Sequence, residues 1–103
     1  MRISDQQKKV ILESVAIELG EDARVFLFGS RVDDTKRGGD IDLFVEVPFQ
    51  IENTVRKKLR IISQIQRRIG EQKIDLIISY PGEYSEEDLP LVIKNARQDG
   101  ILL

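Results

Sequence analysis

Cysteine and histidine are both absent from the 103 residues of this chain. Without them the protein has no disulfide scaffold, no zinc site built from the usual nitrogen and sulfur ligands, and no Ser-His catalytic triad. Any metal ion must be bound by oxygen atoms, which favours a hard ion such as magnesium or manganese. The lack of cysteine is compatible with any redox compartment.

Long apolar runs and an excess of charge of one sign are also missing. No apolar segment approaches the roughly 20 residues of a membrane-spanning helix, and the first residues lack the core of a signal peptide. We therefore expect a cytoplasmic protein with no membrane contact. The formal net charge of −2 gives no general attraction to nucleic acid, so direct binding of nucleic acid is not expected. The length suffices for one hydrophobic core, which predicts a single domain over residues 1–103.

Hydrophobic periodicity predicts a small α/β domain in the order helix, strand, strand, helix, strand, helix. Ser4 and Gln7 have the spacing of a capping box before the first helix, and Gly20 suits its end. The apolar tail, residues 101–103, is expected to add as a strand or to pack into the core, with a partner interface as the second possibility. The predicted helices cover residues 5–19, 55–69 and 85–98, and the predicted strands cover residues 24–28, 40–47 and 73–79.

The first motif with chemical meaning is Gly29-Ser30, directly after the first predicted strand. A strand that ends in Gly-Ser and bends into a helical turn directs backbone N–H groups outward, where they can bind phosphate oxygens. Glycine permits close approach of the phosphate, and the serine hydroxyl adds a donor. The alternative is an ordinary turn with a serine N-cap, which is the commoner meaning of this dipeptide alone.

The second motif is the pair Asp40 and Asp42 in the second predicted strand. Residues two apart in a strand project from the same face, roughly 7 Å apart at Cα. Two carboxylates so placed repel each other unless a cation lies between them, so such a pair often binds a divalent ion. The alternative is that the strand has one solvated face, because polar and apolar residues alternate along it.

The third element is Asp75, which interrupts the apolar third strand. A buried carboxylate is costly to desolvate unless it is paired, hydrogen-bonded or bound to a metal ion. The alternative is an acid at the strand end that reaches solvent. If this strand lies beside the Asp40–Asp42 strand, three carboxylates converge and can bind two divalent ions for a phosphoryl-type displacement.

Together, Gly29-Ser30, Asp40-Ile41-Asp42 and Asp75 resemble the signature of the nucleotidyltransferase superfamily typified by DNA polymerase beta. The short chain and the sequence Gly29-Ser30-Arg31 look most like the minimal nucleotidyltransferases. The resemblance implies a palm-like α/β fold, with a mixed sheet flanked by helices. It also implies ATP as the substrate and magnesium as the cofactor, with two ions, manganese being the other candidate metal.

The resemblance also assigns roles to these residues. Gly29 and Ser30 would bind the β- and γ-phosphates, and Asp40 and Asp42 would bind both metal ions. Asp75 would complete the metal site nearest the acceptor and help to take the proton of the attacking hydroxyl. Arg31 could neutralise phosphate charge, or it is a plain surface arginine.

Many minimal nucleotidyltransferases act as antitoxins beside a helical HEPN-type ribonuclease toxin, and some transfer AMP to a tyrosine of that toxin. The resemblance therefore implies AMP transfer to a hydroxyl of a toxin partner, within a hetero-oligomer or homo-oligomer. The alternative is an antitoxin that blocks its toxin by direct binding. Transfer to a small molecule is a third reading, less favoured because few residues are left for a substrate domain.

The second predicted helix is strongly basic, which has two readings. A charged stretch on an amphipathic helix is usually a solvated polar face, and the sharper interpretation is a docking surface for an acidic partner. The basic residues are Arg56, Lys57, Lys58, Arg60, Arg67 and Arg68.

Overall fold

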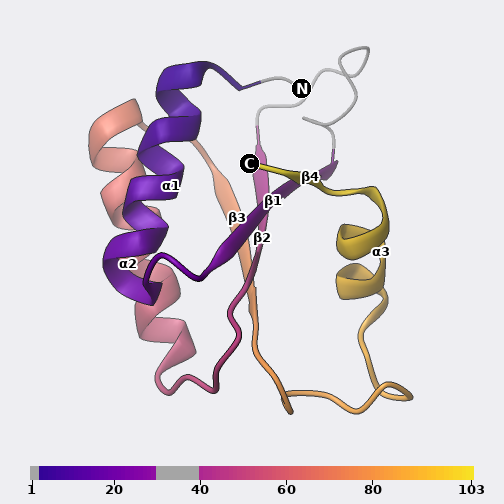
Figure 1. Ribbon diagram of the computed structural model, residues 1–103. Coiled ribbons are helices and arrows are strands. Elements are labelled where there is room, and N and C mark those ends of the chain that lie inside the picture. The colour runs from indigo at the N-terminus through magenta and orange to yellow at the C-terminus, as the bar shows by residue number, and fades with distance from the viewer. Residues whose placement is uncertain (1–2, 30–39) are drawn as a thin grey trace.

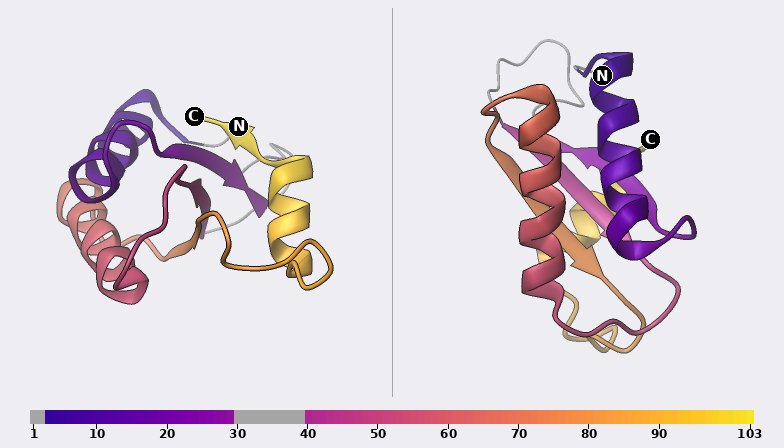
Figure 2. Two further views of the ribbon diagram at one scale, coloured as in Figure 1. Left: turned by 60° about the horizontal axis from the view of Figure 1, so that its bottom comes forward. Right: turned by 90° about the vertical axis from the view of Figure 1, so that its left-hand side faces the viewer.

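The computed structural model describes residues 3–29 and 40–103, which form a small α/β domain with a mixed sheet of four strands. Helices α1 and α2 cover one face of the sheet, and α3 lies against the other face (Figures 1 and 2). The sequence predicts this fold class, a small α/β domain with a mixed sheet flanked by helices, and the structure confirms it. The helices are α1 (Asp5–Leu19), α2 (Thr54–Ile69) and α3 (Leu91–Asp99), and the strands are β1 (Arg24–Phe28), β2 (Ile41–Glu46), β3 (Ile74–Ser79) and β4 (Ile101–Leu102).

The ends of α1 and α2 follow from local sequence. Ser4 Oγ accepts a hydrogen bond from the backbone N–H of Gln7 at 3.0 Å, and the Gln7 side chain accepts one from the backbone N–H of Ser4 at 2.9 Å. This reciprocal capping box starts α1, as predicted. Glycine ends both helices, with Gly20 and Gly70 at positive φ.

The sheet order is β3-β2-β1-β4. Strand β1 pairs antiparallel with β2 and with β4, whereas β2 and β3 are parallel. A parallel pair requires a crossover connection, and here α2 provides it. Because β3 ends the strand order, it is an edge strand.

The main hydrophobic core lies between the sheet and the α1–α2 layer. It combines the inward faces of both helices with alternate residues of the strands. A smaller core lies under α3, where Phe44 is fully buried with Ile93 and Ala96 and its ring centroid is 6.0 Å from that of Phe26. The main core is built from Val10, Ile11, Val15, Leu19, Val25, Leu27, Ile41, Leu43, Val45, Val47, Ile61, Ile65, Ile74, Leu76 and Ile78.

The face of β2 that carries Asp42 is therefore not solvated along its whole length. Helix α3 covers Phe44, two residues beyond Asp42, so this face of β2 is apolar in the middle of the strand. Asp42, at the start of the strand, is half-buried. The face of β2 that carries Asp42 and Phe44 is thus covered by α3 at Phe44 and more open at Asp42.

The prediction of a helix over residues 85–98 was wrong at its start, because α3 begins only at Leu91 with Pro90 as its N-cap. Residues 85–88 form a turn instead, in which Ser85 Oγ donates to Asp88 Oδ2 at 2.9 Å and the Asp88 N–H donates to the Ser85 carbonyl at 3.1 Å. Proline disfavours helical geometry in the residue before it, so the turn cannot continue into α3.

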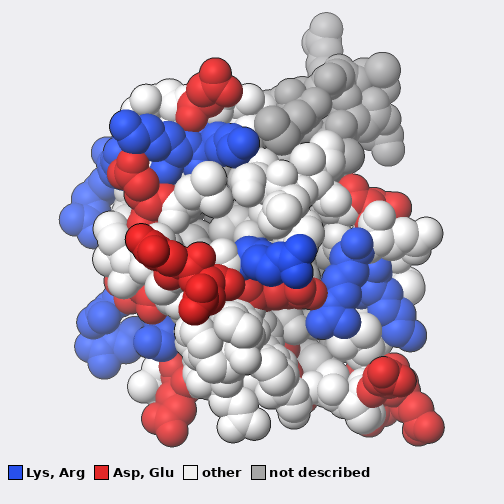
Figure 3. Space-filling model, in the orientation of Figure 1, with Lys and Arg blue, Asp and Glu red and all other residues white. Residues whose placement is uncertain are grey.

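The apolar tail adds to the sheet, as predicted. Ile101 and Leu102 pair antiparallel with Leu27 and Phe26, and the Leu103 N–H donates to the Val25 carbonyl at 2.8 Å. Within the described ranges, no helix is long and apolar enough to cross a membrane. On the face seen in Figure 3, basic and acidic side chains are intermixed, in keeping with the small net charge of −2.

Candidate active site

Asp42 and Asp75 lie side by side on neighbouring strands. They are register partners in the parallel pair β2–β3, between the partners Ile41–Ile74 and Leu43–Leu76. Adjacent strands are about 4.8 Å apart, and register partners in a parallel pair project from the same face. Because their neighbours in the chain point into the main core, both carboxyl groups point to the α3 face, at the end that α3 leaves open. The strand adjacency that the sequence argument required is confirmed.

The Asp42 carboxyl group is in an environment that disfavours its charge. Burial is the largest cause that raises its pKa above the ordinary value, followed by the hydrogen bond with Asp75 and by the negative charges of Asp75 and Asp40. The positive charge of Lys73 only partly opposes this rise in pKa. The negative charges of Asp40 and Asp75 around Asp42 are therefore only partly neutralised by Lys73.

Asp40 lies just outside β2, which begins at Ile41, so the predicted start of this strand was one residue too early. Its Oδ2 atom forms an ion pair with Lys73 Nζ at 3.6 Å, with the two side chains 44% and 70% exposed. The backbone N–H of Ile41 donates to the Lys73 carbonyl at 3.0 Å, which fixes the two segments next to each other.

Gly29 brings backbone against the same carboxylate. It follows β1, whose last residue Phe28 is the register partner of Asp42, and it has a φ of +75°. A Cβ atom at Gly29 would overlap the Asp42 Oδ2 atom, so only glycine fits beside this carboxylate without displacement. The other two residues predicted to bind phosphate, Ser30 and Arg31, lie outside the described residues.

The argument that placed Asp75 among the functional residues was wrong in one respect. Asp75 is exposed, so its carboxylate reaches solvent and its own burial demands no partner. Its position beside Asp42 is what singles it out. The roles of Gly29, Asp40, Asp42 and Asp75 in binding and catalysis remain predictions.

Lys73 is a residue of this site that sequence reasoning missed. The signal was available, since Lys73 precedes Asp75 by two residues and extended residues two apart share a face. Its ion pair with Asp40 depends on the pairing of β2 with β3, which no local pattern reveals.

The donor set suits a hard divalent ion. Asp40, Asp42 and Asp75 offer oxygen ligands alone. Burial, and then the hydrogen bond and charges of neighbouring acids, raise the pKa of Asp42, and a bound cation would favour its ionised form. As the side chains stand, no group of three or more acids within residues 3–29 and 40–103 is arranged to hold an ion. Binding would therefore require these side chains to reorient, with Asp40 leaving Lys73.

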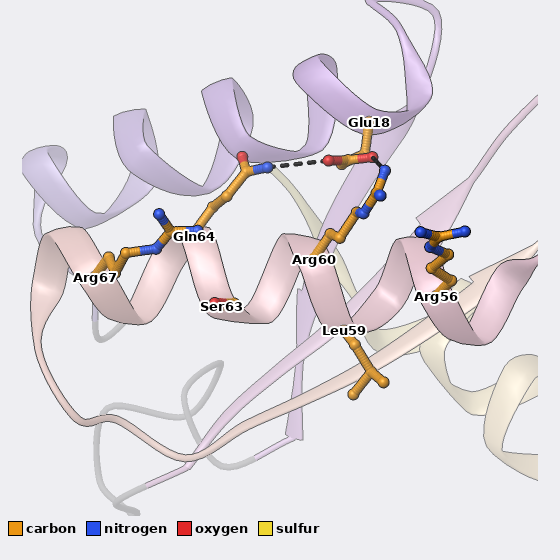
Figure 4. A pocket seen from close by; sticks show the side chains of 7 residues that line it. All are labelled: Glu18, Arg56, Leu59, Arg60, Ser63, Gln64 and Arg67. Carbon is orange, nitrogen blue, oxygen red and sulfur yellow. Dashed lines mark hydrogen bonds and ion pairs between the residues drawn. The ribbon is translucent and has the colours of Figure 1, made fainter.

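A separate hollow of about 390 Å³ lies in the α1–α2 layer, which covers the opposite face of the sheet (Figure 4). Glu18 accepts a hydrogen bond from Gln64 at 3.0 Å and pairs with Arg60 at 3.9 Å, and Arg68 pairs with Glu13 at 2.8 Å. Acids of α1 thus neutralise part of the basic face of α2. The hollow has no pair of carboxylates, so we place the chemistry at Asp42 and Asp75 instead.

Comparison with protein families agrees with this geometry. The family model described as "Nucleotidyltransferase domain" matches residues 8–103, which include every acid of the site. A comparison with curated proteins gave no match. Proteins of the matched family generally use a nucleoside triphosphate and divalent metal ions. Because the match covers most of the chain and the fold agrees with it, this protein belongs to the nucleotidyltransferase domain family.

Proposed function

We propose that this protein is a magnesium-dependent nucleotidyltransferase that transfers AMP from ATP to a hydroxyl group. The proposed acceptor is a tyrosine of a HEPN-type toxin, so the protein would act as an antitoxin. The observation that carries the proposal is the register pairing of Asp42 with Asp75, with the Gly29 backbone directly against the Asp42 carboxylate. A backbone turn and paired carboxylates are the parts that nucleotidyl transfer needs.

The triphosphate would be bound by Gly29, Ser30 and Arg31. Asp40, Asp42 and Asp75 would hold magnesium. Bound magnesium supplies positive charge that neutralises the phosphates and favours attack at phosphorus. The half-buried Asp42 carboxylate would be the ligand least accessible to solvent, whereas Asp75 stays open to the acceptor.

In the proposed reaction, the acceptor oxygen attacks the α-phosphorus of ATP. A bond forms between that oxygen and phosphorus, the bond from the α-phosphorus to the bridging oxygen breaks, and pyrophosphate leaves in line. The proton of the acceptor hydroxyl passes to the Asp75 carboxylate and then to solvent. The exposed position of Asp75 on an edge strand supports this role, because an acceptor on another protein can approach it from solvent.

The test is incorporation of label from ATP labelled at the α-phosphate into a HEPN-type protein from the same organism. We expect label on a tyrosine in the presence of magnesium, and a loss of more than about 100-fold for Asp42→Asn. Asp22→Asn is the matched control, because Asp22 is an exposed acid in the turn before β1. Equal labelling by wild type and Asp42→Asn would contradict the proposal.

The second candidate function is an antitoxin that neutralises its toxin by contact alone. Two large apolar side chains on α2, Val55 and Leu59, are 68% and 60% exposed and could pack against a partner. Asp75→Asn separates the two functions, because it keeps the shape of an exposed side chain and removes its charge. If this variant neutralises the toxin as fully as wild type, contact suffices. If neutralisation is lost while the complex still forms, catalysis is required.

A further inference from the structure

Lys73 stands at the open end of the acid site with its backbone held in place. Its carbonyl accepts a hydrogen bond from the Ile41 N–H, which holds the residue before β3 beside the start of β2. Its side chain is 70% exposed. The ammonium group is 3.6 Å from Asp40 Oδ2. The backbone of Lys73 is therefore fixed, whereas its exposed ammonium group can change position.

Among the residues that the structure describes, Lys73 forms an ion pair with Asp40, an acid of the site. An exposed pair at this distance is weak and easily exchanged. Lysine suits such exchange, because its ammonium is a point charge on a flexible stem with three donors that turn toward any acceptor. A guanidinium held in a bidentate pair would be far less mobile.

We infer that Lys73 is an exchangeable counter-ion that occupies Asp40 in the free protein and moves to the triphosphate when a divalent ion binds. This inference rests on the proposed function. In the free protein, the ammonium neutralises Asp40 at the position that the metal ion needs. Once the ion binds the carboxylates, the released ammonium donates to a phosphate oxygen at the same open end of the sheet.

Loss of the Lys73 ammonium should change the affinities for metal ion and for nucleotide in opposite directions. Removing the ammonium removes one competitor of the metal ion and one nearby positive charge, so metal alone should bind more tightly. The same change removes a charged donor to the triphosphate, so nucleotide should bind less tightly. A lysine that only positions Asp40 would instead weaken metal binding when it is removed, and a plain surface lysine would change neither.

The experiment compares wild type with Lys73→Gln in two titrations. The first measures Mn²⁺ alone by the spin-resonance signal of the free ion, and we expect affinity to rise about 3-fold to 10-fold. The second measures a non-hydrolysable ATP analogue with saturating Mg²⁺ by calorimetry, and we expect affinity to fall about 10-fold, the value of one charge-assisted hydrogen bond. Lys73→Arg, which keeps the charge, should restore nucleotide affinity in part.

Lys94→Gln is the control for loss of a positive charge, because Lys94 is exposed on α3, and it should change neither affinity. If Lys73→Gln weakens Mn²⁺ binding, or leaves both affinities unchanged, the inference is overturned while the proposed function stands. If wild type binds neither Mn²⁺ nor the analogue, the proposed function fails and the inference fails with it. Thermal unfolding of all three variants verifies that they are folded.

Discussion

The backbone of Gly29 and the carboxylate of Asp42 lie so close that a Cβ atom at position 29 would overlap the Asp42 Oδ2 atom. Phe28, the residue before Gly29, is the register partner of Asp42, so the pairing of β1 with β2 sets this contact. The Gly29 backbone and the Asp42 carboxylate are therefore in direct contact. A substitution at Gly29 should therefore displace the Asp42 side chain.

Gly29→Ala should lower stability and also damage the site. Alanine at a φ of +75° costs about 1–2 kcal/mol in backbone strain, and its Cβ must displace the Asp42 carboxylate. Gly70→Ala is the matched control, because Gly70 has a φ of +97° with no atom within 4 Å of the added Cβ. We expect chemical denaturation to show a loss of stability for both variants, and loss of Mn²⁺ and nucleotide binding for Gly29→Ala alone. Normal ligand binding by Gly29→Ala would contradict the assigned contact.

Asp42→Asn should stabilise the metal-free protein at neutral pH. Burial and the neighbouring acids raise the pKa of Asp42 in the folded state, so its ionised form is disfavoured by folding. The gain from the substitution should be largest above the folded pKa and should vanish as the pH falls below the ordinary value of 3.8, where both states are protonated. Thermal unfolding with a chelator present, as a function of pH, measures this difference.

Glu13→Gln should change the stability of the protein in the opposite direction from Asp42→Asn. The hydrogen bond from Arg68 is the largest cause that lowers the pKa of Glu13, so its ionised form is favoured by folding. Its substitution should slightly destabilise the protein at neutral pH, and that loss should disappear as the pH falls through the lowered pKa. A loss of stability for Asp42→Asn, as expected for Glu13→Gln, would show that folding does not disfavour the charge of Asp42.

Magnesium or manganese with ATP should raise the melting temperature of wild type. A ligand that binds only the folded state stabilises it by about 2.7 kcal/mol at a concentration 100 times its dissociation constant. Removing the ion with a chelator should reverse the rise. Asp42→Asn should lose most of the gain and Asp22→Asn should keep it. An equal rise in both variants would place the metal site elsewhere.

Ile93→Ala should destabilise the protein by about 2–5 kcal/mol, because Ile93 packs on Phe44 in the core under α3 and is only 3% exposed. Leu91→Ala, in the same helix, removes a side chain that is 70% exposed and should change stability by less than about 0.5 kcal/mol. Equal effects in urea denaturation would mean that α3 does not cover the sheet as described.

The sequence by itself determined the elements whose signals are local. The Ser4–Gln7 capping box and the ends of the helices at Gly20 and Gly70 depend on contacts within a few residues. The short apolar run of β1 is typical of a buried strand and ends at glycine. Periodicity therefore predicted them closely. The start of α3 was missed because the Ser85–Asp88 turn competes with helix formation before Pro90, and helix-forming residues alone do not reveal such competition.

The candidate acids were also chosen from the sequence, through their spacing and their resemblance to a known signature. Only the tertiary structure decided how they meet. The register of Asp42 with Asp75 arises from parallel pairing across the α2 crossover. Packing under α3 buries Phe44, whereas Asp75, near the start of β3, stays exposed. The Lys73–Asp40 ion pair joins segments far apart in the chain. Such relationships depend on which strands become neighbours, and burial of the whole core selects that arrangement.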